Sequence, residues 1–140
     1  MNTTKESPLG TNIKTTGKID TKVLLSTLWI VVMMNMLKAD ILSLYIPGAV
    51  DELVNAAGET PIPLLMLVFG AIPMELAIVM IILSRVLKYG VNRWVNIIVG
   101  IVTIAYIWVG AGPYPHYTFI ATVETICLLL IIWNAWKWTE

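Results

Sequence analysis

The chain has 140 residues, of which 58% are hydrophobic and 13% are charged. A soluble domain carries about 25% charged residues, so the composition excludes an ordinary soluble protein and indicates a membrane protein. Nine Lys and Arg residues balance nine Asp and Glu residues, and without a broad positive field we expect no nucleic-acid binding. Cys127 is the only cysteine and His116 the only histidine. This excludes an internal disulfide, a paired-cysteine site and a two-histidine metal site within one chain.

Residues 1–21 are rich in Thr, Lys, Asn and Gly, and they predict a flexible cytoplasmic tail without a signal sequence. Residues 22–140 are predicted to form one transmembrane domain. Four apolar segments, each near the ~20 residues that cross a bilayer, lie at about residues 22–40, 61–83, 91–110 and 117–136. The predicted fold class is therefore all-α, an integral membrane four-helix bundle.

Pro47 and Gly48 interrupt the chain after the first predicted span, and such a pair ends a helix. Residues 49–57 then predict a short helix with one apolar and one acidic side, which we expect to lie at the membrane interface. Inside the second predicted span, Pro73 cannot donate its backbone hydrogen bond, so it predicts a bend.

The distribution of positive charge predicts the orientation, because loops rich in Lys and Arg stay in the cytoplasm. One predicted side carries eight of the nine positive residues: Lys5, Lys14, Lys18, Lys22, Arg85, Lys88, Arg93 and Lys137. The other side carries only Lys38. We therefore expect a multi-pass protein of the cell membrane with both termini in the cytoplasm.

Two ionisable residues are predicted at similar depth below the outer boundary, Lys38 at roughly 6 Å and Glu124 at about 10 Å. A charge in hydrocarbon costs about 2.5–3.5 kcal/mol, so each needs a partner or an aqueous cavity. If the first and last spans adjoin, the two can form an ion pair or share a water-filled pocket, with Asn35 one turn below Lys38. The alternative is that Lys38 extends to water and Glu124 hydrogen-bonds a neighbouring Thr or Tyr.

Glu75 lies deeper, two residues after Pro73, and has no cation at its own depth on the same span. One interpretation places it in a small cavity beside the bend. The other has it hydrogen-bond a backbone carbonyl and hold helices together. The methionines of the spans are interpreted as adaptable core residues, and no metal site is predicted.

The third span carries small and polar residues at spacings of three and four: Arg93, Asn96, Gly100, Thr103, Ile107 and Gly110, with Tyr106 beside them. Such a stripe lets a second helix approach closely, so we expect it to be buried. The last span offers Thr118, Ala121 and Thr125 as the matching face, bordered by Glu124 and Cys127.

His116 follows Tyr114 and Pro115 at the outer end of the last span. Its side chain titrates near physiological pH, so it is a candidate proton carrier, and the alternative is an interfacial hydrogen-bonding residue. His116 lies two turns from Glu124, so a relay between them needs a water molecule or Tyr117.

Several short stretches taken together resemble a known family: residues 25–29 (LSTLW), 39–43 (ADILS) followed by Pro47 and Gly48, 83–87 (LSRVL), 91–96 (VNRWVN), 115–117 (PHY), Glu124 and 136–138 (WKW). The chain is similar over residues 21–138 to an uncharacterised family of small prokaryotic four-span membrane proteins, a domain of unknown function distantly similar to DoxX-like proteins. The resemblance implies a four-helix membrane fold. Its DoxX-like part implies a link to quinone-dependent sulfur or thiol chemistry.

Three functions remain open at this point. The first is an outward-facing pocket that binds or transports a small or lipid-like ligand. Its candidate residues are Asn35, Lys38, Asp40, Glu75, Tyr106, His116 and Glu124. The second is a membrane enzyme acting on a lipid or quinone, with His116 and Glu124 as acid and base. The third is a non-catalytic membrane subunit. The predicted partners are the lipid bilayer, a lipid, quinone or small-molecule ligand, and further copies of the chain, and no cofactor is identified.

Overall fold

The computed structural model describes residues 19–59, 62–110, 112 and 114–139. These residues form the helices α1 (Thr21–Ser43), α2 (Ala49–Glu59), α3 (Ile62–Val86), α4 (Tyr89–Gly110) and α5 (Pro115–Lys137). All except α2 are long and apolar enough to cross a membrane. The predicted all-α, four-span fold with a short helix after the first span is confirmed. Of the predicted tail, residues 1–18 lie outside the described residues.

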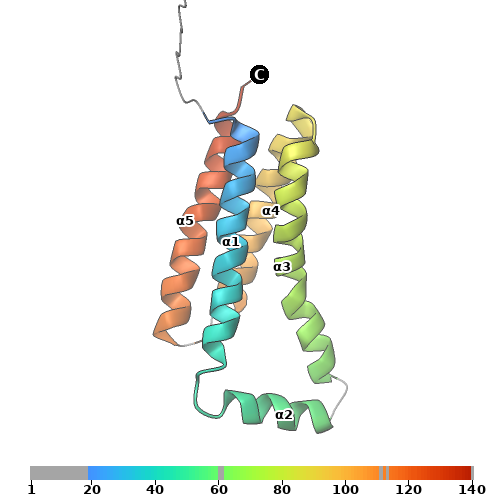
Figure 1. Ribbon diagram of the computed structural model, residues 1–140, viewed down its shortest axis with the longest axis vertical. Coiled ribbons are helices and arrows are strands. Elements are labelled where there is room, and N and C mark those ends of the chain that lie inside the picture. The colour runs from blue at the N-terminus through green and yellow to red at the C-terminus, as the bar shows by residue number, and fades with distance from the viewer. Residues whose placement is uncertain (1–18, 60–61, 111, 113, 140) are drawn as a thin grey trace, which may run out of the picture.

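The helix α1 is the centre of the arrangement, since it packs along both α3 and α5, and α5 packs along α4. Contacts between α3 and α4 are much sparser. Figure 1 shows the reason: the C-terminal end of α3 lies close to the other helices, and α3 leans away from them toward its N-terminus. There α2 lies across the end of the bundle. The bundle is therefore compact at one end and open at the other.

The ends of the helices follow local chemistry. Asp20 caps α1, since its carboxylate accepts a hydrogen bond from the Lys22 backbone N–H at 3.0 Å, as an N-cap residue does. Gly48 has φ of 86°, a left-handed conformation that suits glycine, and it turns the chain from α1 into α2. The Lys22 Nζ donates to the Leu87 carbonyl at 2.9 Å, which satisfies a backbone oxygen left free just after α3.

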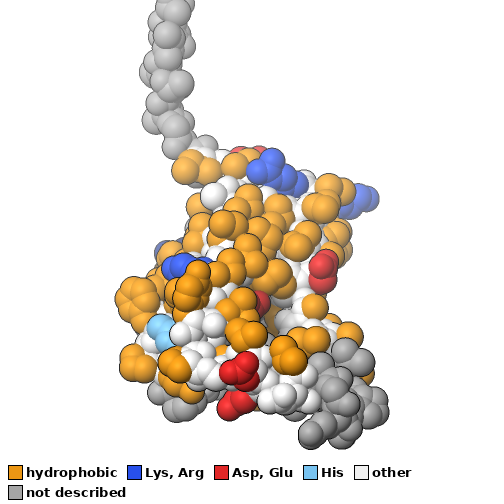
Figure 2. Space-filling model, turned by 60° about the horizontal axis from the view of Figure 1, so that its bottom comes forward, with side chains coloured by type: hydrophobic (Ala, Val, Ile, Leu, Met, Phe, Trp, Pro, Cys, Tyr) orange, Lys and Arg blue, Asp and Glu red, His pale blue; other side chains and the backbone are white. Residues whose placement is uncertain are grey.

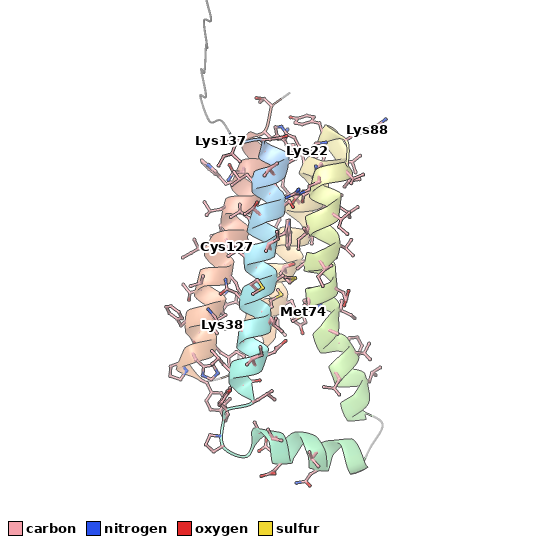
Figure 3. All side chains as sticks on the ribbon, in the orientation of Figure 1. Lys22, Lys38, Met74, Lys88, Cys127 and Lys137 are labelled. Carbon is pink, nitrogen blue, oxygen red and sulfur yellow. The ribbon has the colours of Figure 1, made fainter. Side chains whose placement is uncertain are left out.

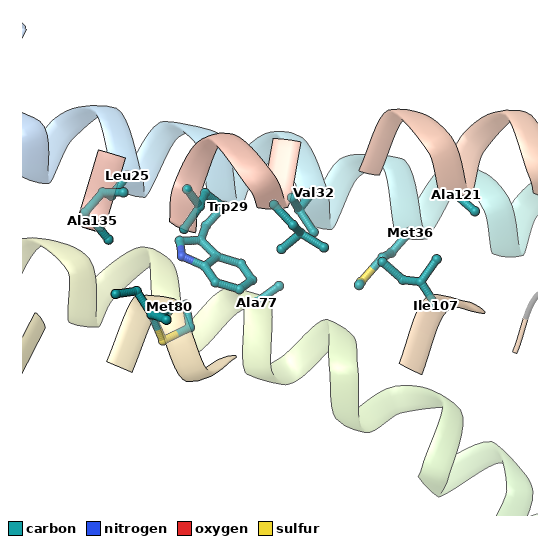
Figure 4. Close-up of a cluster of buried hydrophobic side chains, with 12 residues drawn as sticks. Leu25, Trp29, Val32, Met36, Ala77, Met80, Ile107, Ala121 and Ala135 are labelled. Carbon is teal, nitrogen blue, oxygen red and sulfur yellow. The ribbon is translucent and has the colours of Figure 1, made fainter. Parts of the chain in front are cut away.

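The apolar core lies along α1 and includes side chains of α3, α4 and α5, and Figure 4 shows its side chains along the length of α1. Trp29 is fully buried, with Met80 and Ala77 of α3 on one side of it. Val32 and Met36 continue the core along α1. Because lipid tails are as apolar as these side chains, close packing and hydrogen bonds are what hold such helices together.

The contact between α4 and α5 depends on Gly100. A Cβ atom at this position would lie 3.0 Å from Cγ1 of Ile132, closer than most Cβ contacts, so a larger residue would require Ile132 to move. Asn96, Gly100, Thr103 and Ile107 are buried as the stripe predicts, whereas Arg93 is half-buried and Gly110 exposed.

The predicted face of α5 is corrected. Thr118 is exposed, and the buried side consists of Ile120, Ala121, Glu124, Leu128, Ile131 and Ala135. Branched and large apolar side chains fill this face because α1 packs against it as well as α4. Glu124 thus lies within the buried face and not at its border.

The two ends of the bundle differ in charge. Lys22, Lys88 and Lys137 lie at the compact end (Figure 3), which we call the basic end. Figure 2 shows Lys and Arg side chains at this end, whereas the histidine and several acidic side chains lie toward the α2 end, where a further Lys or Arg side chain lies near the histidine. At the basic end Arg93 lies over the Trp136 ring at 5.2 Å, an arrangement typical of the membrane interface.

Candidate functional site

The basic half of the bundle contains a buried polar network. Asn96 is its centre: its Oδ1 accepts hydrogen bonds from Trp29 Nε1 at 2.7 Å and from Ser84 Oγ at 3.1 Å. Its Nδ2 donates to the Asn92 Oδ1 at 2.7 Å, and the Asn92 Nδ2 donates to the Ser84 carbonyl at 2.7 Å. All four residues are fully buried. The network therefore joins α1, α3 and α4 and satisfies its own side chains.

Sequence reasoning singled out Asn96 of this network but missed Trp29, Ser84 and Asn92 as its partners. A signal was present, since Asn92 and Asn96 are four residues apart and so share one helix face. Ser84 was hidden because it belongs to the turn between two spans in the sequence. In the structure it is fully buried, because α3 continues to Val86.

Glu124 is the other buried polar side chain of interest, and it lies in the α2 half of the bundle. It is 3% exposed, and its Oε1 has no hydrogen-bond partner. A buried polar atom without a partner is rare and calls for an explanation. Glu124 is thus unlike the basic-half network, in which the amide and hydroxyl groups pair with one another.

Two charged residues of α1 lie close enough for their charges to act on the Glu124 carboxyl, Asp40 and Lys38. The structure thus brings together three of the predicted pocket residues. Figure 3 shows Lys38 on the α2 half of α1 and Cys127 of α5 nearer the middle of the bundle. The predicted proximity of the first and last spans holds, since α1 and α5 pack along each other.

Lys38 and Glu124 are both described residues, and they form no direct ion pair. The Lys38 side chain is exposed and lines a hollow of about 510 Å³ on the outward face of α1, together with Asn35 and Leu42. The Asn35 Nδ2 donates to its own helix, at 3.1 Å from the Val31 carbonyl. Asn35 and Lys38 therefore share a face of α1, whereas Glu124 is buried between helices.

Tyr106 links α4 to the diverging part of α3. Its hydroxyl lies 3.5 Å from the Phe69 carbonyl oxygen, a long contact. Phe69 is four residues before Pro73, so this carbonyl is the one that loses its helical partner to the proline. Tyr106 therefore lies where α3 diverges from the bundle. Among the described residues, no hydrogen bond joins Tyr106 to Glu124.

His116 belongs to an aromatic cluster at the α2 end. Its ring stacks on Tyr114 at 5.8 Å and lies 4.7 Å from the ring of Tyr117. The buried His116 Nε2 has no hydrogen-bond partner, and neither has the Glu124 Oε1. No direct hydrogen bond therefore joins these two atoms.

Glu75 lies on a different face of α3 from Pro73. Pro73 is buried and Glu75 is exposed, so Glu75 does not share an enclosed cavity with the bundle's other acids. It is separate from the candidate site around Glu124.

A segment of α3 in the α2 half of the bundle has no buried side. The six consecutive residues 67–72 are all exposed, although they belong to a segment of mean hydropathy 2.3. A helix buried against neighbours would show a buried side at every turn. The α2 half of the bundle is therefore open between α3 and its neighbours, in the half that contains Glu124.

Chemically, the Glu124 carboxyl offers one free oxygen that can accept a hydrogen bond or hold a cation. Within the residues that the structure describes, no group of three or more His, Cys, Asp or Glu side chains could hold a metal ion.

Comparison with known proteins places the chain in a family. A model of the family of unknown function DUF6326 matches residues 16–140, and the chain belongs to this family. No curated protein and no solved structure matches it. The family agrees with the predicted resemblance to a domain of unknown function, while the DoxX-like and prokaryotic parts of that resemblance stay predictions.

Proposed function

We propose that this member of DUF6326 binds a small lipid-like molecule in the α2 half of its bundle, with Glu124 as the group that recognises it. The ligand carries a hydroxyl or amine group at one end of an apolar body. The α2 end faces the outside of the cell membrane, and both termini are cytoplasmic. This orientation is supported by Lys22, Lys88 and Lys137 at the opposite end.

The observation that carries the proposal is the unpartnered oxygen of a carboxyl group that is 3% exposed. A buried acceptor without a hydrogen bond costs about 1–3 kcal/mol, and more if it is charged. The same chain pairs the amides of Asn92 and Asn96 at 2.7 Å, so it can satisfy buried polar groups where stability alone requires it. A ligand with a donor group removes the cost at Glu124.

The apolar body of the ligand is supported by the open α2 half. Residues 67–72 of α3 are exposed on every side, and Lys38 and Asp40, whose charges act on the Glu124 carboxyl, lie near the C-terminal end of α1. A molecule that enters from the outer leaflet would have apolar walls along α3 and polar groups at its head. These are the features of an amphipathic ligand site.

An enzyme acting on a lipid or quinone needs His116 and Glu124 at one reacting atom. The ring of His116 instead stacks on Tyr114 and lies against Tyr117, and its Nε2 makes no hydrogen bond to Glu124, so the observations favour binding over catalysis. Transport of the same ligand needs the site to open to the cytoplasm as well. The buried network around Asn96 supports a closed basic half, and hence binding from the outside.

Photolabelling tests the proposal. The purified protein in lipid nanodiscs is exposed to a diazirine-bearing long-chain alcohol, with the matching alkane probe as a comparison. We expect the alcohol to label residues 115–128 more strongly than the alkane does. Glu124→Leu should reduce the labelling by about tenfold, since it removes the hydrogen bond that holds the head group.

Thr122→Val is the matched control. Thr122 is exposed on the same helix, and its Oγ1 donates a hydrogen bond to the Thr118 carbonyl of that helix at 2.7 Å. This variant should therefore label like the wild type. Equal labelling of wild type and Glu124→Leu, or equal labelling by alcohol and alkane, would contradict a recognition role for Glu124.

A further inference from the structure

A second feature, independent of Glu124, is an ionisable side chain on the outside of the bundle. Glu75 is exposed within the spanning segment Leu67–Val86. At 1.5 Å rise per residue it lies about 12 Å along the helix from Leu67 and about 16 Å from Val86. A glutamate side chain is too short to reach either membrane interface from there. Its carboxyl group therefore faces the hydrocarbon unless another molecule covers it.

No described residue of the chain hydrogen-bonds to the Glu75 carboxyl, and its face of α3 is turned away from α1. That face carries an unbroken pattern of apolar residues at alternating spacings of three and four. The residues with Glu75 at their centre are Leu65, Val68, Ile72, Val79, Ile82 and Val86, which are 45–72% exposed. We call these residues and Glu75 the α3 stripe. Spacings of this kind are those by which two helices pack along each other.

We propose that the α3 stripe is the interface between two copies of this chain, with the two Glu75 carboxyl groups hydrogen-bonded to each other across a two-fold axis. In a two-fold interface, residues on the axis meet their own copies. A carboxylic acid has a donor and an acceptor, so an identical acid can complete its hydrogen bonds. Lipid tails offer neither, and a different protein would have to supply a donor at this one depth.

The rest of the stripe suits the same partner. Five of its six apolar members are Val or Ile, and these β-branched side chains lose little rotamer freedom when they pack. The stripe lies on the outward face of α3, away from the contacts with α1, so a second copy can dock without displacing any helix of the first. The Glu124 site stays available in each copy.

Disulfide crosslinking of the full chain in lipid vesicles tests this interface. In a Cys127→Ser background, Val79→Cys and Ile82→Cys place a single thiol on the α3 stripe. Ile101→Cys places one on the lipid-facing surface of α4, where Ile101 is likewise exposed. Upon oxidation we expect a covalent dimer from both stripe positions and little from Ile101→Cys.

The role of Glu75 is tested in the same vesicles by energy transfer between donor-labelled and acceptor-labelled chains. Glu75→Leu should weaken association by about tenfold, the effect of losing an interhelical hydrogen bond. Glu75→Gln should keep association, because its amide also has a donor and an acceptor.

The proposal is overturned by any of three results. The first result is a wild-type chain that stays monomeric at high protein-to-lipid ratio. The second is equal crosslinking at the α3 stripe and at Ile101→Cys, and the third is unchanged association of Glu75→Leu. The first of these would leave a different protein as the occupant of the α3 stripe. None of the three bears on ligand binding at Glu124, so the two proposals fail separately.

Discussion

At the scale of single residues, the chain treats its two kinds of buried polar group differently. The amides of Asn92 and Asn96 pair with each other, with Ser84 and with Trp29. The carboxyl of Glu124 keeps an unpartnered oxygen. The first arrangement explains stability, because a hydrogen bond inside a bilayer has no competing water. The second has no such explanation, and the proposed ligand site rests on it.

Replacement of Asn96 tests the stabilising role of the network. Asn96→Leu leaves Trp29 Nε1 and Ser84 Oγ without their acceptor, so we expect the free energy of unfolding to fall by a few kcal/mol. Asn134→Leu is the control, because the Asn134 amide donates only to the Leu130 carbonyl of its own helix. Unfolding in mixed lipid and detergent micelles, followed by the tryptophan signal, gives both values. A loss of equal size in the two variants would contradict a special role for the network.

At the scale of helices, sequence reasoning predicted the existence and type of every element, since apolar runs of about 20 residues have one common explanation. It was also right about the buried stripe of α4, because small residues mark close approach. It misplaced the buried face of α5. Every side of this helix is apolar, so the packing of the neighbouring helices decides which side is buried. For the same reason the exposed position of Glu75 could not be read from periodicity.

The contact of α4 with α5 gives a second prediction about stability. Gly100→Ala would bring a methyl group to 3.0 Å from Ile132 Cγ1, so the Ile132 side chain must shift by a few tenths of an ångström within a packed contact. We expect a loss of about 1–3 kcal/mol in the free energy of unfolding. Gly70→Ala has nothing within 4 Å of the new methyl group. It should be neutral or stabilising, since alanine favours helix, and a loss equal to that of Gly100→Ala would refute close packing at Gly100.

At the scale of the whole molecule, the bundle consists of two unlike halves. The basic half is compact, with its polar groups paired and its cations at the membrane interface. The α2 half is open, because α3 leans away from the other helices toward its N-terminus and residues 67–72 are exposed. The candidate ligand site belongs to this open half. We therefore expect the bundle to be accessible from the α2 end, on the outside, and closed from the basic end.

Chemical access to two buried alanines of α5 tests this claim most directly. Ala121, one turn from Glu124, and Ala135, in the basic half, are 4% and 0% exposed, so Ala121→Cys and Ala135→Cys in a Cys127→Ser background form a matched pair. A charged, membrane-impermeant methanethiosulfonate is added to the outside of intact cells. We expect Ala121→Cys to react and Ala135→Cys to stay unmodified. Asp51→Cys on α2 is the control that should react fully. Equal reaction at both alanine positions, or reaction at Ala135→Cys alone, would contradict an outward-facing site in the α2 half.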